Sequence, residues 1–245
     1  MEEVLIITGG SKGIGEGIVK AYVAKGVKVF SVARTSNALL TLKGVSQIAF
    51  DLAKTYEIET MFAHIFNLLK ATNISKITLI NNAGTLGKIG PLQKLDVATI
   101  ESTIKLNTVV PFICSAAFIK LTDGWTAKKT IINISSGAAL KPYFGWSMYC
   151  SSKAAVNMLT QTLATEQAHF ANGVKVLAIA PGVVDTDMQT QIRSSNKVDF
   201  KDIERFISLK NDGDLFDAAY VGEQICKMDY DYSIESGSVL RVESD

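Results

Sequence analysis

Thr8-Gly9-Gly10-Ser11-Lys12-Gly13-Ile14-Gly15 is the stretch that decides the fold of this 245-residue chain. It follows directly on the apolar run Val4-Leu5-Ile6-Ile7 and leads into a segment of helical period. Glycines let a backbone turn sharply and approach a pyrophosphate closely, and the helix N-terminus behind them offers free N–H groups and a positive dipole end. Strand, glycine loop and helix in this order predict a dinucleotide-binding unit at the start of an α/β domain.

Short apolar runs rich in β-formers alternate with helical segments along the rest of the chain. The runs lack period-two polarity, which indicates strands that are buried on both faces. This alternation predicts a single-domain α/β Rossmann fold over residues 1–245, with a doubly wound parallel sheet of seven strands flanked by helices. The predicted strands are Val4–Thr8, Val27–Val32, Gln47–Phe50, Ile77–Asn81, Thr130–Ser135, Val174–Ala180 and Ser238–Val242. The predicted helices are Ile14–Lys25, Tyr56–Ala71, Thr99–Leu121 and Ser147–Ala171.

Two features interrupt this regular pattern. Pro111 falls inside the predicted helix Thr99–Leu121, where we expect it to kink the helix or mark a break. The segment Asp185–Asp214 is more polar and less regular than its surroundings. We expect it to form an excursion over the end of the sheet rather than a second domain.

Composition excludes several classes of function. A net charge of +1 gives no electrostatic footprint for nucleic acid or an anionic membrane. No apolar run approaches the ~20 residues that cross a bilayer, and only residues 1–3 precede the first strand, which leaves no room for a targeting segment. The cysteines and histidines are scattered, which argues against a disulfide framework or a metal site. We expect a cytoplasmic protein without a metal.

The end of the second predicted strand bears on the cofactor. An NAD enzyme usually places an acid about twenty residues beyond the loop, where it binds the ribose 2′-hydroxyl. Here the strand ends Ser31-Val32-Ala33-Arg34-Thr35, without an acid. The guanidinium of Arg34 suits a 2′-phosphate, and Lys12 could reach the same phosphate, unless both are solvated surface cations. We therefore expect NADP(H).

Tyr149 and Lys153 are spaced four residues apart at the start of a predicted helix, so that they share one helix face. A nearby cation favours phenolate and lowers the pKa of a tyrosine, which can then donate a proton to a carbonyl oxygen as hydride arrives at carbon. Ser136 lies thirteen positions upstream of Tyr149, at a strand end. A hydroxyl there can hydrogen-bond the developing oxyanion, with Ser135 as its rival and turn capping as the alternative role.

The spacing T-G-x-x-x-G-x-G, the Y-x-x-x-K pair and the Ser–Tyr separation resemble the short-chain dehydrogenase/reductase family, from Leu5 to about Val242. The resemblance implies that Asn107 joins the catalytic set by holding a water between Lys153 and solvent. It also implies a homodimer or homotetramer packed through the two longest predicted helices. The implied catalytic residues are Asn107, Ser136, Tyr149 and Lys153.

The same resemblance extends to the cofactor contacts. It implies that Asp51 accepts a bond from the adenine amino group, although it could equally be a turn residue. The run Asn81-Asn82-Ala83-Gly84 would line the cofactor and brace the sheet, and the stretch 181–186 would hold the nicotinamide carboxamide. The implied cofactor site comprises Gly9, Ser11, Lys12, Gly13, Ile14, Gly15, Arg34, Asp51, Asn82, Ala83, Gly84, Tyr149, Lys153, Pro181, Gly182, Val184 and Thr186.

Two segments are expected to select the substrate. The segment 142–148 is unusually aromatic, and the excursion after the sixth strand, where the family builds a mobile lid, carries several apolar side chains. They predict an apolar pocket for flat aromatic groups, unless these side chains pack the core or an oligomer interface. The pocket residues that we expect are Tyr143, Phe144, Trp146 and Met188.

Several stretches resemble one branch of the family more closely. Ile134–Ala138, Pro142–Trp146 and Ala180–Gln189 resemble the sepiapterin reductase-like branch, and Thr190–Ser195 is most similar to bacterial benzil reductases that form (S)-benzoin. The resemblance implies that NADPH reduces one carbonyl of an aromatic 1,2-diketone.

Two alternatives remain at this point. Sepiapterin reductases anchor the pterin through an aspartate near the C-terminus, where this chain has Leu240 or Arg241, while Glu243 and Asp245 are displaced. A non-catalytic NADP-sensing protein is the alternative from another class, and the presence of both Tyr149 and Lys153 argues against it.

Overall fold

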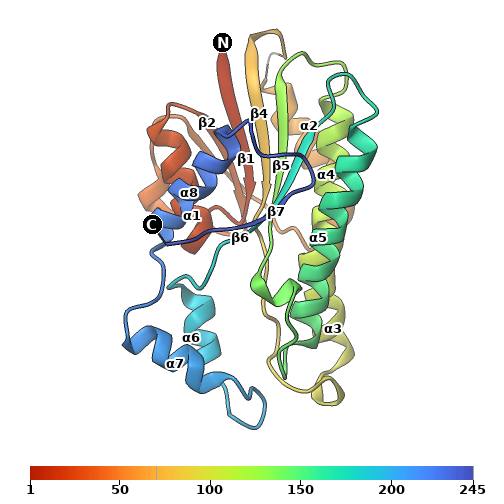
Figure 1. The fold of residues 1–245 in the computed structure, drawn as a ribbon. Helices are drawn as coiled ribbons and strands as arrows, with labels where there is room; N and C mark the ends of the chain where they lie inside the picture. The colour runs from red at the N-terminus through yellow and green to blue at the C-terminus, as the bar shows by residue number, and fades with distance from the viewer. Residues whose placement is uncertain (70, 245) are drawn as a thin grey trace.

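The computed structural model describes residues 1–69 and 71–244. Within these residues the chain forms one sheet of seven parallel strands, in the order β3-β2-β1-β4-β5-β6-β7, with helices on both faces (Figure 1). The predicted doubly wound α/β sheet is therefore confirmed. The strands are β1 (Glu2–Thr8), β2 (Lys28–Ala33), β3 (Val45–Ala49), β4 (Ile74–Asn81), β5 (Lys128–Ile134), β6 (Lys175–Ala180) and β7 (Val239–Arg241). The α-helices are α1 (Gly13–Ala24), α2 (Ile58–Asn67), α3 (Val97–Ile104), α4 (Val110–Leu121), α5 (Ser147–Gln167), α6 (Asp187–Arg193), α7 (Ile203–Asn211) and α8 (Ala218–Tyr230).

The strand order reverses at β1, which pairs with β2 on one side and with β4 on the other. In an open parallel sheet, ligands bind in the crevice outside the carboxyl ends of the strands at such a switch point. The loops that follow β1 and β4 open onto this crevice, so the fold itself places the cofactor region there.

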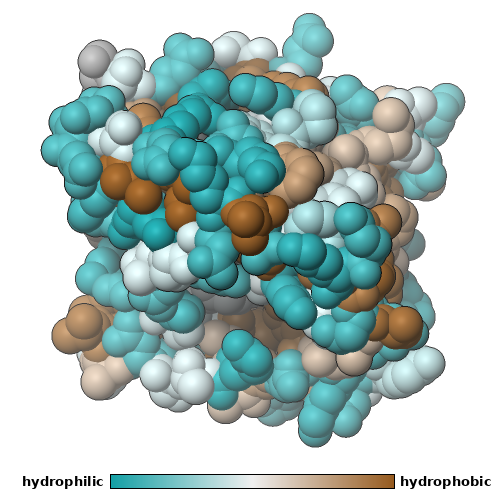
Figure 2. Space-filling model, turned by 90° about the horizontal axis from the view of Figure 1, so that it is seen from below, coloured by the Kyte–Doolittle hydropathy of each residue, from teal (hydrophilic) through white to brown (hydrophobic). Residues whose placement is uncertain are grey.

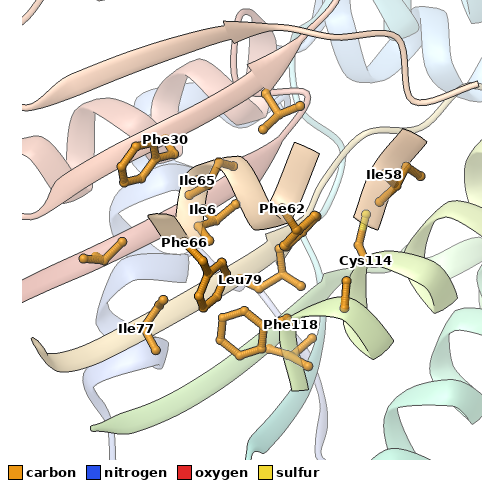
Figure 3. Close-up of a cluster of buried hydrophobic side chains, with 14 of the residues drawn as sticks. Ile6, Phe30, Ile58, Phe62, Ile65, Phe66, Ile77, Leu79, Cys114 and Phe118 are labelled. Carbon is orange, nitrogen blue, oxygen red and sulfur yellow. The ribbon is translucent and has the colours of Figure 1, made fainter. Parts of the chain in front are cut away.

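Each face of the sheet is covered by a hydrophobic core, which explains why the strands read as continuous apolar runs. On one face, helices α2 and α4 pack against the central strands; Figure 3 shows Phe62 and Phe66 of α2 beside Phe118 of α4, with Ile6 and Leu79 beneath them. On the other face, α1 and α8 lie together.

Helix α8 binds to α1 through two glycines. A Cβ at Gly17 would lie 1.9 Å from the carbonyl oxygen of Ala218, and one at Gly222 would lie 2.3 Å from the carbonyl carbon of Gly17. Only glycine permits this approach, which anchors the C-terminal part of the chain to the helix behind the phosphate loop. Helix α8 was missing from the predicted elements, although the Asp217 carboxylate caps it by accepting from two backbone N–H groups.

A buried ion pair ties α8 to the amino end of the sheet. The ammonium of Lys76 on β4 lies 3.0 Å from Oδ1 of Asp229, and both side chains are at most 3% exposed. The other carboxylate oxygen accepts from the hydroxyls of Tyr22 and Thr78, each at 2.8 Å. This network lies at the opposite end of the strands from the crevice, and its role is therefore to hold the fold.

The predicted helix Thr99–Leu121 is broken, as expected from Pro111. A π-helical turn over Lys105–Val109 interrupts the α-helical pattern between α3 and α4, and Pro111 lies in the first turn of α4. By length and composition, the helical stretch Val97–Leu121 is apolar enough to cross a membrane, although Glu101, Lys105 and Asn107 interrupt its apolar residues. The core helix of a soluble protein passes the same test, and Val110, Cys114 and Phe118 pack into the core shown in Figure 3.

The excursion Asp185–Asp214 does lie over the carboxyl end of the sheet (Figure 1), but it is more regular than predicted. It contains α6 and α7, and we call residues 185–214 the lid segment. Two predicted helices are shorter in the structure: Tyr56–Ala71 is reduced to Ile58–Asn67, with Lys70 outside the described residues, and Ser147–Ala171 ends at Gln167.

Candidate active site

The glycine loop after β1 has a backbone that fits a pyrophosphate. Gly9 and Gly13 take positive φ values of 68° and 56°, which other residues rarely adopt. A Cβ at Gly15 would lie 2.1 Å from the carbonyl oxygen of Gly9, so any side chain at position 15 would clash with the loop backbone. Helix α1 begins after Lys12 without a side-chain cap, which leaves its first N–H groups free for an anion.

The run after β4 braces this loop. The backbone N–H groups of Asn82 and Ala83 both donate to Oγ1 of Thr8 at 3.1 Å. The Asn82 amide donates to the carbonyl oxygens of Thr8 and Gly9. The two loops at the switch point therefore form one rigid wall of the crevice.

The segment after β6 touches the phosphate loop from the other side. A Cβ at Gly13 would lie 3.2 Å from Cγ2 of Thr186, and the Lys12 ammonium lies 2.7 Å from the Asp187 carboxylate at the start of α6. Gly182 has a φ of 79°, and the backbone of Val184 forms a bridge with Phe216. The predicted cofactor residues 181–186 therefore line the crevice opposite the run after β4.

Three charged candidates lie near this crevice with different surroundings. Arg34 follows β2 and is exposed. Lys12 is also exposed, and its ammonium is paired with Asp187. Asp51 is exposed as well, and its Oδ1 accepts from the N–H of Ala53 at 3.0 Å, which gives it the turn role that the sequence left open.

Helix α5 places Tyr149 and Lys153 on its buried face, where they are 8% and 6% exposed. The Lys153 ammonium donates to the carbonyl oxygen of Ile134 at 2.7 Å and lies 5.8 Å from the centroid of the Tyr149 ring. Gly84 lies between this ammonium and Asn107, since a Cβ on it would lie 3.6 Å from Nζ and 3.4 Å from the Asn107 Oδ1.

The π-helical turn presents Asn107 to the site, an arrangement frequent at functional positions. Its Oδ1 accepts from the N–H of Thr85 at 2.9 Å, and its amide donates to the Thr85 carbonyl oxygen at 2.7 Å and to Ser152 Oγ at 3.2 Å. The side chain is therefore held in one orientation.

The two candidate serines are distinguished by their contacts. Ser135 is buried, and its hydroxyl donates to Oδ1 of Asn157 at 2.5 Å. Ser136 caps the following turn by accepting from the N–H of Ala138, and its hydroxyl faces Tyr149 closely enough to lower the pKa of that phenol. Ser136 is therefore the serine that faces the tyrosine.

Burial shifts both titratable groups toward their neutral forms. It raises the pKa of Tyr149, an effect that the hydrogen bond from Ser136 partly opposes. It lowers the pKa of Lys153 to about 8. The expectation of a lowered tyrosine pKa is therefore wrong, because desolvation by burial outweighs the opposing effect of Ser136.

An aromatic layer covers the tyrosine. Trp146 is 6% exposed; its ring lies edge-on to Tyr149 at 5.6 Å and stacks on Phe200 of the lid segment at 4.6 Å. Tyr143 lies 5.0 Å from Trp146, and its hydroxyl accepts from Arg205 of α7. The other buried members of this cluster are Leu86, Ala138, Ile192, Ile203 and Phe206.

Three of the four predicted pocket residues, Tyr143, Trp146 and Met188, belong to this cluster. Phe144 does not, since it is 46% exposed and lies beneath the Lys201 ammonium. Leu86 and Ala138 were missed. The available signal was their position, two residues after the N-N-A-G run and two residues after Ser136 respectively.

Comparison with known proteins agrees with this geometry. A family model described as short chain dehydrogenase matches residues 3–197. The benzil reductase ((S)-benzoin forming) of Bacillus cereus is 40% identical over 246 residues, covering 98% of each chain. Sepiapterin reductase of Meriones unguiculatus is 32% identical, covering 96% of this chain and 94% of that protein. The crystal structure of the KRED1-Pglu enzyme matches with a TM-score of 0.84 at 29% identity, covering 97% of this chain and 99% of that one.

The fold and the site together define an oxidoreductase of the Rossmann type that uses a nicotinamide cofactor, NAD(P)(H). The chain belongs to the short-chain dehydrogenase/reductase family.

Replacing Lys153 by Met should stabilise the protein while it removes activity. The pKa of Lys153 is about 8 in the folded chain, against 10.5 ordinarily. The unfolded chain therefore binds more protons between these values, and wild-type stability should rise with pH across this window. Below pH 8 the folded chain bears the full free-energy cost of burying the charged ammonium. Because Lys153→Met removes this cost, the free energy of unfolding of the variant at pH 7 should exceed that of the wild type by about 1–3 kcal/mol.

Urea unfolding of both proteins at pH 7 and pH 9.5 measures this difference. The difference in free energy of unfolding between Lys153→Met and the wild type should be smaller at pH 9.5 than at pH 7. The control Lys43→Met, at an exposed position, should be as stable as the wild type at both pH values. A variant less stable than the wild type at pH 7 would contradict the argument.

Proposed function

We propose that this protein is an NADPH-dependent carbonyl reductase that reduces one carbonyl of an aromatic 1,2-diketone, as in the conversion of benzil to benzoin. The observation that carries the proposal is the buried Tyr149, with the half-buried Ser136 facing it, beneath the aromatic layer of Trp146, Phe200 and Phe206. Flat aromatic groups fit such a layer, and a carbonyl oxygen between the two hydroxyls would meet two donors. The 40% identity with a benzil reductase supports the same substrate class.

The side chains divide the chemistry among them. The nicotinamide, when bound, supplies hydride to the carbonyl carbon. Tyr149 holds its proton because burial raises its pKa, and it donates that proton to the carbonyl oxygen while Ser136 hydrogen-bonds the same oxygen. Lys153, with a pKa of about 8, can give up a proton near neutral pH and so restore the tyrosine.

Asn107 completes this arrangement. Its Oδ1 accepts one hydrogen bond, from the N–H of Thr85, which leaves a second lone pair for the water expected between Lys153 and solvent. The contacts of its amide hold that oxygen in place.

The preference for NADP(H) rests on the chain that follows β2. Arg34 is exposed at this point, and Thr35, Ser36 and Asn37 come next, without an acid for a ribose 2′-hydroxyl. The ion pair of Lys12 with Asp187 is exposed at both ends and therefore weak, so Lys12 can exchange that partner for a phosphate.

Sepiapterin reduction is the weaker reading of the same site. Leu240 packs against a core and Arg241 pairs with Ala180 in the sheet, so neither offers the carboxylate of a pterin anchor. Asp245 lies outside the described residues. We also place the enzyme in the cytoplasm, since its three cysteines are free thiols.

The first experiment follows NADPH oxidation with benzil, sepiapterin and an aliphatic ketone in parallel. Benzil should be the preferred substrate, and Tyr149→Phe should lower kcat by about 10²–10⁴-fold, the usual contribution of a positioned acid. The NADPH Kd, read from fluorescence, should stay within a few-fold of the wild type. Preference for sepiapterin, or unchanged turnover in the variant, would overturn the proposal.

Replacing Arg34 by Asp should reverse the cofactor preference. A charged hydrogen bond to phosphate contributes about 1.5–3 kcal/mol, so the Kd for NADPH should rise about 10–100-fold. Binding of NADH should be unchanged or tighter, because Asp can accept from a ribose hydroxyl. Arg34→Lys is the matched control and should retain part of the preference. If Arg34→Asp weakened the binding of NADPH and NADH equally, the result would contradict a contact between Arg34 and the 2′-phosphate.

We further propose a homodimer formed through α4 and α5. Phe112 and Met158 are 47% and 62% exposed, and they line an apolar groove of about 460 Å³ between the two helices. A two-fold axis through this face would bury both copies of the groove.

Light scattering after gel filtration should give the molar mass of a dimer or a tetramer. The variant Met158→Glu should lower this molar mass toward that of a smaller assembly. Phe170→Glu, at an equally exposed position outside the groove, should leave the assembly unchanged. A monomeric wild type would rule the interface out.

A further inference from the structure

Trp146 carries a buried donor that has no acceptor. Its side chain is 6% exposed, and its indole Nε1 makes no hydrogen bond within the part of the chain that the structure describes. A buried N–H without a partner costs free energy, and native proteins rarely leave one unless a ligand or a function requires it. The donor therefore calls for an acceptor from outside the chain.

The ring that carries this donor is held firmly. Phe200 stacks on it at an interplanar angle of 12°, and Phe206 lies at 5.5 Å. Both belong to the lid segment, which is tied down by the Lys94–Asp199 ion pair and by the bond from Gln191 to the Gly87 carbonyl oxygen. Figure 2, which views the lid end of the molecule from below, shows hydrophobic residues scattered among polar ones there. The indole therefore belongs to an apolar layer that the lid segment covers.

The nearest catalytic group identifies the ligand. Trp146 lies edge-on to Tyr149, which shares its substrate oxygen with Ser136 in the proposed reaction. A vicinal dicarbonyl carries a second oxygen on the carbon next to the reacting one. That oxygen would lie in the layer that surrounds the tyrosine, where Trp146 is the buried member whose donor has no partner among the described residues.

We propose that the indole N–H of Trp146 donates to the second carbonyl oxygen, and so makes this site selective for 1,2-dicarbonyls over monoketones of the same shape. The inference rests on the proposed function and deepens it. A monoketone would leave the donor unpaired, and sites built to hydrogen-bond a group reject analogues that lack it far more strongly than they reject a change of size. Trp146 acts on specificity, whereas Tyr149 and Ser136 act on the reacting carbonyl.

The test compares benzil with deoxybenzoin, in which a methylene replaces the second carbonyl on the same skeleton. The readout is the ratio of the two kcat/KM values in the wild type and in Trp146→Phe, which keeps an aromatic ring but lacks the N–H. The variant should lower this ratio about 10-fold or more, because only benzil loses a hydrogen bond when the N–H is removed. Phe200→Leu is the matched control: it removes the stacked ring, leaves the N–H, and should affect both substrates alike.

An unchanged ratio in a folded Trp146→Phe would overturn the inference. If that variant does not fold, replacement of the indole by the equally shaped benzothiophene, which has sulfur in place of N–H, gives the same comparison. Failure of the proposed function is a separate result, because it appears as absent benzil turnover in the wild type. A wild type that reduces benzil, with an unaltered ratio in the variants, refutes only the role of Trp146.

Discussion

Buried polar side chains at the carboxyl ends of β4 and β5 bind helix α5 to the sheet, and the position of the catalytic groups depends on them. The Asn81 amide donates to the Oδ1 of Asn133, whose own amide donates to Thr160 on α5. Two residues further on, just past the end of β5, the hydroxyl of Ser135 donates to Asn157. Because an unpaired polar group in this interior would be costly, α5 has one favourable position against β5, and that position brings Tyr149 to Ser136.

The site departs from the most stable arrangement in two places. It buries the Lys153 ammonium, whose pKa falls to about 8, and it buries a Trp146 N–H that has no acceptor among the described residues. Both features disfavour the folded chain, and both serve the proposed chemistry. The paired charges of Lys76 and Asp229 lie at the other end of the sheet, where the strands are fully covered. Such a division between a stable framework and a costly site is common in enzymes.

The sequence predicted the sheet, because apolar runs are local signals, while the predicted catalytic set stays a prediction drawn from residue spacings. It did not predict α8, because the buried face of this helix includes the polar Asp229 and Gly222, which contacts α1, and neither residue fits an apolar pattern. Aromatic residues only two positions apart also differ: the side chain of Trp146 packs into the cluster, and that of Phe144 does not. The direction of the Tyr149 pKa was wrong because it depends on burial by distant parts of the chain, including the lid segment. Tertiary packing, which no local pattern encodes, decides each of these properties.

The central claim is that the crevice delivers hydride to a carbonyl carbon whose oxygen lies at Tyr149 and Ser136. The most direct measurement is a single turnover of benzil with NADPH carrying two deuterium atoms at the nicotinamide C4, followed by mass spectrometry and NMR of the product. The account predicts benzoin with one deuterium on its carbinol carbon. Benzoin without that deuterium, or cofactor left unoxidised beside unreacted benzil, would contradict it.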